Sequence, residues 1–292
     1  MDKQKLLEVM RDIQAKYGEG TIYVLGSKKE RMNIPRWDTG LIDLNEIIGG
    51  GMPEGRILEL YGTEGSGKTT LAHHLTAQCE KAVNIPIEGT FSSERARIFG
   101  NKPKQLIVRR AEFGEEVMES TIDFARAGVP LIVIDSVPAM LTRKELEEDN
   151  VEKEAQRGRI AALLTRTLPK LVHICESTGT SVIFINQLRD EMGGMLFGPK
   201  THTPGGRALK HYCSLRIQVA RRSWITIPNY GNGASTAKDE KVGLIIKVKI
   251  EKSKVCNPLG ECELPCFFDR GFVKHEDIKQ IRLELMKDRR GK

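Results

Sequence analysis

A glycine-rich segment with one lysine and one threonine carries the clearest chemistry in this chain of 292 residues. Glycines let the backbone turn tightly, so that several N–H groups can point at one anion. The Lys68 ammonium group can reach terminal phosphates, and the Thr69 hydroxyl group is an oxygen ligand that suits Mg²⁺. The spacing matches G-x-x-x-x-G-K-[ST] and predicts a loop that holds the phosphates of a nucleotide. The loop consists of Gly62, Thr63, Glu64, Gly65, Ser66, Gly67, Lys68 and Thr69.

The segments on both sides of this loop fit the same interpretation. Residues 56–61 are typical of a short strand that enters the loop, and residues 70–79, from Thr70 onward, are typical of a helix that leaves it. A helix in that place adds the positive end of its dipole to the site. The alternative is a glycine-rich turn with no ligand, and the flanking strand and helix favour the nucleotide.

Two carboxylate side chains follow predicted buried strands. In parallel sheets the carboxyl ends of the strands meet at the ligand-binding edge. Asp135 follows the apolar run 131–134 and is a candidate for holding Mg²⁺ beside the phosphates, with a helix cap as the alternative. Glu88 follows the run 83–87 and is placed to activate water for attack on the terminal phosphate. By spacing alone, a surface-loop glutamate fits position 88 equally well.

Amide and basic side chains follow a third apolar run, 182–185. Asn186 and Gln187 end it and place two amides beside the expected nucleotide without adding charge. The next segment, 188–210, is glycine-rich and polar, and this composition suits a long loop that contacts phosphate backbones. Its basic residues are Arg189, Lys200, Arg207 and Lys210.

The order of predicted elements indicates an α/β fold. Short, almost continuously apolar strands favour a mostly parallel central sheet flanked by helices. Strands are expected at 57–61, 83–88, 106–109, 130–135, 180–186, 213–219 and 243–251, and helices near 68–80, 92–99, 114–127 and 156–177. An N-terminal helix over 3–17 and a strand over 21–25 precede this core. That strand pairs either with a neighbouring subunit or with its own core.

We expect four parts along the chain. They are a helix–strand oligomerisation arm (1–26), a linker (27–38), the core with its loops (39–272) and a short charged tail (273–292).

Composition narrows the classes of protein that fit. The net charge is +7 and the pI is near 9.0, which favours a polyanionic partner. No apolar run is long enough to span a membrane and the N-terminus has no signal-peptide pattern, so we expect a cytoplasmic protein. Reduced thiols fit that compartment, with Cys79, Cys175 and Cys213 expected to be buried. Zinc binding at Cys256, Cys262, Cys266 and His275 is the less favoured alternative, because the spacing is not that of structural zinc sites.

Taken in order, these motifs resemble the RecA family of homologous-recombination ATPases over most of the chain. Helicases and other ATPases of the same fold share the phosphate loop and the strand-end aspartate, but not the whole series. The resemblance is carried by residues 16–22, 39–44, 50–56 with the loop that follows, 133–137, 184–189 and 205–210. We expect no counterpart of the large C-terminal domain of cellular relatives. In this respect the chain resembles compact versions of the family, such as virus-encoded ones.

The resemblance implies a role for each matching position. ATP and Mg²⁺ are the implied ligands, with Glu88 as the general base and Gln187 as the sensor of the γ-phosphate. Lys252 and Lys254 are expected to contact the ATP of a neighbouring subunit, although the residues alone indicate a solvated strand edge. Arg95 and Phe268 are expected beside the base, and Arg95 stands where the family often has an aromatic residue, which predicts looser base selectivity. The implied DNA-binding residues are Arg157, Arg159, Arg189, Met192, Gly205, Gly206 and Arg207.

The activity implied is ATP-dependent recombination. Subunits are expected to form a helical filament on single-stranded DNA, pair it with double-stranded DNA and exchange strands, with the N-terminal strand docking on the adjacent subunit. Single-strand-binding and loader proteins are further expected partners. The loop near 144–159 is rich in acidic residues, so contact with DNA there depends on Arg157, Arg159 or backbone amides. Two other interpretations stay open: a ring helicase or branch-migration motor, and an ATP-gated accessory protein that coats single strands.

Overall fold

The computed structural model describes residues 2–18, 22, 24, 34–89, 91–147, 158–190, 201–228 and 239–290. The chain divides into two units, residues 1–35 and residues 36–292. No helix in the described ranges is long and apolar enough to cross a membrane.

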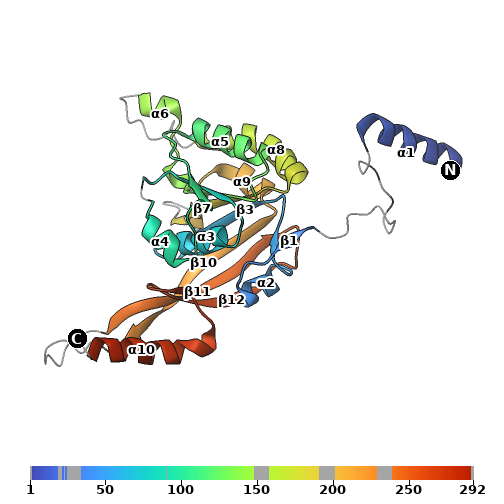
Figure 1. The fold of residues 1–292 in the computed structure, drawn as a ribbon. Helices are drawn as coiled ribbons and strands as arrows, with labels where there is room; N and C mark the ends of the chain where they lie inside the picture. The colour runs from blue at the N-terminus through green and yellow to red at the C-terminus, as the bar shows by residue number, and fades with distance from the viewer. Residues whose placement is uncertain are drawn as a thin grey trace, which may run out of the picture. The chain divides into compact units, whose positions relative to one another are not determined.

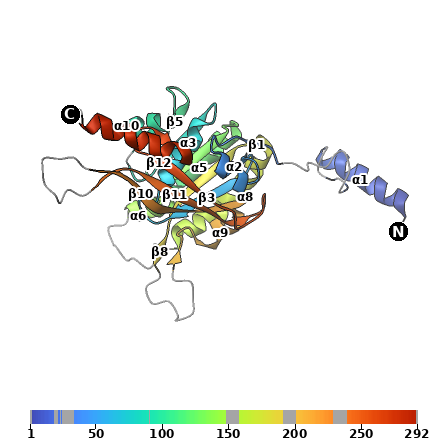
Figure 2. The same cartoon turned by 90° about the horizontal axis from the view of Figure 1, so that it is seen from below.

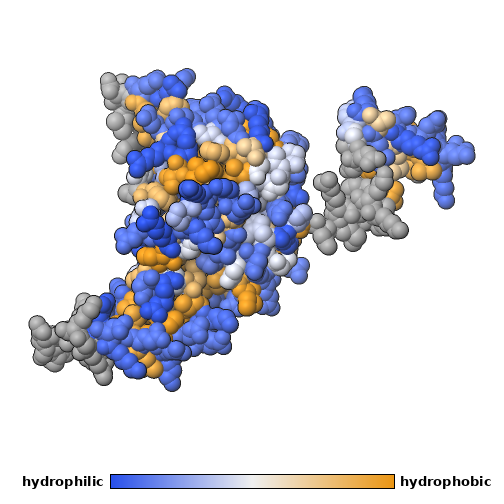
Figure 3. Space-filling model, in the orientation of Figure 1, coloured by the Kyte–Doolittle hydropathy of each residue, from blue (hydrophilic) through white to orange (hydrophobic). Residues whose placement is uncertain are grey.

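The first unit is built on helix α1 (Lys3–Tyr17). Asp2 caps its N-terminus by accepting a hydrogen bond from the Gln4 N–H at 3.0 Å, and Gly18 ends it with φ of 100°. None of its residues is buried, and Leu6, Leu7, Val9 and Tyr17 are exposed. Figure 3 shows apolar side chains at the surface of this helix between hydrophilic ones. Most of the predicted strand at 21–25 lies outside the described residues.

The second unit contains a nine-stranded sheet in the order β13-β12-β11-β10-β3-β7-β6-β4-β5 (Figure 1). The parallel part runs from β10 to β5, as the almost continuous apolar runs predict. Its strands are β3 (Ile57–Gly62), β4 (Ala82–Pro86), β5 (Leu106–Val108), β6 (Leu131–Asp135), β7 (Ser181–Gln187) and β10 (Leu215–Ile227). The predicted mixed α/β fold with a mostly parallel central sheet is confirmed.

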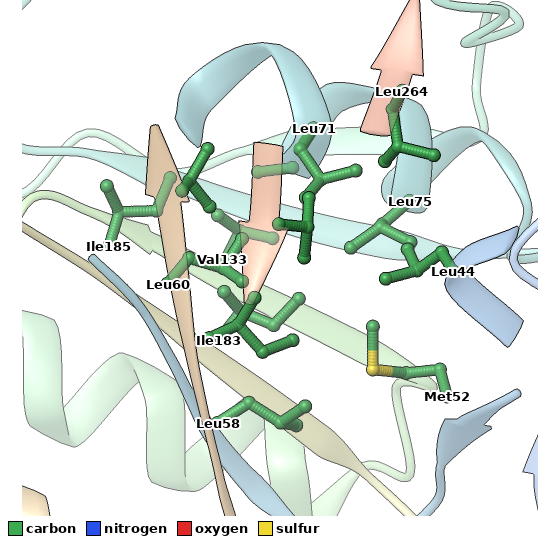
Figure 4. Packing of buried hydrophobic residues seen from close by; sticks show 14 of the residues in the cluster. Leu44, Met52, Leu58, Leu60, Leu71, Leu75, Val133, Ile183, Ile185 and Leu264 are labelled. Carbon is green, nitrogen blue, oxygen red and sulfur yellow. The ribbon is translucent and has the colours of Figure 1, made fainter. Parts of the chain in front are cut away.

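Helices bury both faces of this sheet. Alternate residues of one strand enter different cores: Leu131 and Val133 pack on one side of β6, and Ile132 and Ile134 on the other. The first core also contains residues of α2 (Ile42–Ile47) and α3 (Lys68–Ala77), and Figure 4 shows part of its packing. The second core contains residues of α5 (Gly114–Arg126), α8 (Arg159–Thr178) and α9 (Gly206–Tyr212). Cys79, Cys175 and Cys213 are buried free thiols, as predicted.

An antiparallel extension widens the sheet beyond what the sequence predicts. Strand β10 continues to Ile227 and pairs with β11 (Glu240–Ser253), which pairs with β12 (Glu261–Phe267) and then β13 (Gly271–Phe272). Helix α10 (Ile278–Arg290) lies against this extension in Figures 1 and 2. Its Ile278, Ile281, Leu285 and Met286 join a third apolar cluster with β10, β11 and β12. The expected charged tail therefore contains a helix that packs on the sheet.

Short elements complete the unit. Two small sheets pair β1 (Arg36–Trp37) with β2 (Met52–Pro53) and β8 (Arg189–Asp190) with β9 (Thr201–His202). Helices α4 (Ser93–Ile98) and α6 (Arg143–Glu147) and the 3-10 turns Val137–Ala139 and His275–Asp277 join the larger elements.

Candidate nucleotide-binding site

The phosphate loop lies where two strands leave no room for side chains. Strand β3 is buried throughout and leads into the loop, and α3 begins at Lys68 directly after it. A Cβ atom added to Gly62 would lie 1.9 Å from the Val219 carbonyl oxygen of β10. One added to Gly67, where φ is 99°, would lie 2.5 Å from the Ile246 side chain of β11. Glycine is therefore required at both ends of the loop by close packing and, at position 67, also by backbone conformation.

Lys68 extends along this loop and is largely buried. Its Nζ atom donates to the carbonyl oxygens of Gly62 at 3.1 Å and Thr63 at 2.7 Å. Burial lowers the pKa of this ammonium group, and the charges of Asp135, Glu88 and Glu64 oppose that shift. The cation is held within a few ångströms of the loop backbone, where a phosphate group could replace its carbonyl partners.

Thr69 and Asp135 place two oxygen atoms that could bind a metal ion beside Lys68. The Thr69 hydroxyl donates to Oδ2 of Asp135 at 2.8 Å. Burial raises the pKa of Asp135 to about 6, with the nearby charge of Glu88 adding to the shift. Two carboxylates, Asp135 and Glu88, therefore share this place with Lys68 as the nearby cation. A hard cation such as Mg²⁺ fits this donor set, because it prefers oxygen ligands and would stabilise the ionised form.

Glu88 follows β4, and Gln187 ends β7; their side chains meet across the end of β6, which lies between these two strands. Gln187, the last residue of β7, donates from Nε2 to Oε1 of Glu88 at 3.3 Å. The Ser136 hydroxyl, directly after β6, donates to the same oxygen. The structure therefore brings the strand-end residues Glu88 and Gln187 together, and adds Ser136. The sequence carries no signal for Ser136 beyond its place after Asp135.

Asn186 does not share this position, although the sequence analysis expected both amides beside the nucleotide. Consecutive strand residues face opposite sides of a sheet, and Asn186 is fully buried on the other side. Its Nδ2 atom donates to Oε1 of Glu59 and to the Pro204 carbonyl oxygen, both at 2.8 Å. Arg216 of β10 donates from Nε to the other oxygen of Glu59 at 2.5 Å. This network ties the three strands β3, β7 and β10 to one another and to Pro204.

A pocket of about 240 Å³ lies beside the phosphate loop. Arg95 and Phe268, which the family resemblance predicted beside the base, both line it. The rest of the lining consists of residues 65–70, Leu244 and Trp224. Trp224 has no role in the sequence analysis, because nothing in the sequence places β10 next to the loop.

The predicted lysine pair stands at the end of β11 and contacts the C-terminal part of α9. Lys252 donates from Nζ to the carbonyl oxygens of Lys210 at 2.5 Å and His211 at 3.0 Å, and Lys254 donates to that of His211 at 3.0 Å. Neither lysine lines the pocket beside the phosphate loop of its own chain. Burial and the adjacent charge of Lys254 lower the pKa of Lys252. The C-terminal carbonyl groups of a helix suit such cations.

The predicted DNA-binding residues are only partly described. Arg157 and Met192 lie outside the described residues. Arg159 is the first residue of α8, and Arg189 in β8 is exposed. Gly205 and Gly206, with φ of 94° and 72°, begin α9, and Arg207 follows as an exposed residue. The predicted zinc alternative finds no support, since no group of three or more potential ligands gathers in the described ranges.

Fold and site together define a nucleotide-binding protein with a RecA-type core. The family model for the RecA N-terminal domain matches residues 4–273. "Protein RecA" of Campylobacter jejuni strain 81-176 is 36% identical over 291 residues, which cover 97% of this chain and 81% of the relative. The proteins of the same name from Campylobacter fetus and Aquifex aeolicus are each 35% identical over 97% of this chain. They are covered over 81% and 80% of their own length. The chain belongs to the RecA family.

Proposed function

We propose that the chain is an ATP-dependent DNA recombinase that forms filaments on single-stranded DNA and exchanges strands with homologous duplex. The observation that carries the proposal is the meeting of Lys68, Thr69, Asp135, Glu88 and Gln187 at one edge of the parallel sheet. Membership of the RecA family supports the DNA part of the proposal.

In this proposal ATP occupies the phosphate loop, and Lys68 leaves the carbonyl groups of Gly62 and Thr63 for the β- and γ-phosphates. Thr69 and Asp135 would hold Mg²⁺, which would supply positive charge to the phosphate oxygens. The main-chain N–H groups of the loop and the start of α3 bind the remaining phosphate oxygens.

Glu88 acts as the general base that takes a proton from the attacking water. Both Ser136 and Gln187 donate to its Oε1 atom, which orients the carboxylate and leaves Oε2 to accept the proton. Because Gln187 touches Glu88 and the 188–206 segment follows it directly, the same amide is placed to report the γ-phosphate to the DNA-binding loop.

A neighbouring subunit is proposed to complete the site. Glu88 and Thr69 are exposed in the single chain, whereas phosphoryl transfer is favoured where water is excluded. Lys252 and Lys254 of the adjacent subunit supply positive charge to the γ-phosphate, and the N-terminal arm holds the subunits in a helical array. Docking of the lysines on α9 links this contact to the helix that follows the DNA-binding loop.

The double substitution Lys252→Ala with Lys254→Ala tests that arrangement. We expect hydrolysis stimulated by single-stranded DNA to fall about 100-fold or more, because cations supplied in trans stabilise the transition-state charge. Nucleotide binding to the isolated chain is expected to stay within about twofold, because neither lysine lines its own pocket.

The matched control is Lys247→Ala with Lys249→Ala on the same strand. Those two lysines pair with Glu261 and Glu251 at the protein surface. DNA-stimulated hydrolysis at the wild-type rate in the first double variant would contradict the arrangement in trans.

A further inference from the structure

We propose that Trp224 is the surface against which the base of the bound nucleotide packs, and that it favours purine nucleotides. This inference rests on the proposed function, since it assigns a residue to the same site. Trp224 lines the 240 Å³ pocket together with residues 65–70 of the phosphate loop. Its side chain is 37% exposed, so a ligand can reach it.

A β-bulge turns Trp224 toward the phosphate loop. Arg221 pairs with Ile246 and Trp224 pairs with Leu244. The chain therefore advances three residues on β10 but only two on β11, and Arg222 is the extra residue without a partner in the register. Ile246 and Leu244 share one face of β11, and both approach Gly67. Residues directly opposite each other project from the same face, so Arg221 and Trp224 also face the loop. Without the bulge, Trp224 would project from the other face.

The surroundings of Trp224 suit a base that carries phosphates. Phe268 meets the indole ring edge-on, with centroids 6.3 Å apart. The guanidinium group of Arg221 lies 4.3 Å from the ring centroid and its Nη1 atom lies 3.5 Å from the Gly65 carbonyl oxygen. The Lys241 ammonium group lies 4.5 Å from the same ring. A base stacked on the ring takes the place of one cation, whose charge can then pair with the phosphates.

The aromatic residues that line the pocket are Trp224 and Phe268, whereas α4 contributes a guanidinium group. Arg95 also lines the pocket, and its guanidinium group lies 5.8 Å from the centre of the Phe99 ring. Stacking favours purines over pyrimidines, since two fused rings bury more area than one.

The fluorescence of Trp224 provides a direct test. The chain has two tryptophans, and Trp37 in β1 packs against the core of the sheet. The buried Nε1 atom of Trp37 has no hydrogen-bond partner within the described ranges, so Trp37→Phe removes an unpaired polar group and leaves Trp224 as the single tryptophan. We expect ATP to quench or shift the emission of the Trp37→Phe protein. Inorganic tripolyphosphate, which occupies the loop without a base, is expected to leave the emission nearly unchanged.

Binding constants of Trp224 variants complete the test. Trp224→Ala is expected to weaken ATP binding about tenfold, as loss of one base-stacking surface does, with tripolyphosphate binding unchanged. Trp224→Phe, which keeps an aromatic ring, is expected to stay within about threefold, and circular dichroism confirms that both variants fold. ATP binding by Trp224→Ala at the parental affinity would overturn the inference while leaving the proposed function intact. If the Trp37→Phe protein bound neither ATP nor tripolyphosphate, both the inference about Trp224 and the proposed function would be overturned.

Discussion

Replacing Glu88 with glutamine is expected to lower the rate of ATP hydrolysis by about 10²- to 10⁴-fold, the range over which a general base contributes. Glutamine keeps the shape of the side chain and an oxygen that can accept hydrogen bonds from Ser136 and Gln187. It cannot take a proton from water at neutral pH. ATP binding is therefore expected to change little, and single-turnover hydrolysis measured beside equilibrium ATP binding separates the two effects.

Glu119→Gln provides the control, because Glu119 is an exposed residue of α5. Its hydrolysis rate is expected to match that of the unchanged protein. If Glu88→Gln hydrolysed ATP at an undiminished rate, another group would have to be the base and the role given to Glu88 would be wrong.

Replacing Lys68 with alanine is expected to abolish ATP turnover through the loss of binding. The ammonium group is the cation at the centre of the loop, and removing one partner of a buried, charged hydrogen bond costs about 2–5 kcal/mol. That range corresponds to an affinity for ATP lower by roughly 30- to several thousand-fold. Titration calorimetry with ATP and Mg²⁺ measures the change directly.

The two variants should fail in different ways. Glu88→Gln is expected to bind ATP without hydrolysing it, and Lys68→Ala to lose binding itself. Lys170→Ala, at an exposed position on α8, controls for the loss of one positive charge. Unimpaired ATP turnover by Lys68→Ala would overturn the assignment of the site.

The centre of the fold could be predicted because its signals are local. Buried parallel strands are almost continuously apolar, and the residues after them stand at the ligand-binding edge. The positions of Asp135, Glu88 and Gln187 beside the loop followed from that rule. The same periodicity also shows why Asn186 was misplaced, since adjacent residues of one strand face opposite sides of the sheet.

The antiparallel edge was harder to predict, for physical reasons. Strand β12 contains Pro265 and two glutamates, and proline is usually confined to the edges of sheets. Pro265 is tolerated here because β12 is next to the edge of the sheet, and its outer neighbour β13 has only two residues. Helix α10 is highly charged and has few apolar side chains, so its sequence alone did not predict a packed helix. Its partner surface is the antiparallel edge of the sheet, which the sequence did not reveal either.

Contacts between distant segments could not be predicted from the sequence. Strand pairing determines three such features. They are the contacts of Glu59 with Asn186 and Arg216, the contact of Lys252 with α9, and the bulge beside Trp224. Strand pairing is set by the whole sheet, and a shift by one residue would turn Trp224 away from the site.

Strand exchange tests the central proposal most directly. Purified protein, ATP and Mg²⁺ are mixed with single-stranded DNA and a labelled duplex, which is homologous in one reaction and heterologous in the other. We predict joint molecules with the homologous duplex alone, and none when ATP is omitted. Coated DNA and ATP turnover without joint molecules would contradict a recombinase. An unwinding assay would then distinguish a motor from a single-strand-binding accessory protein.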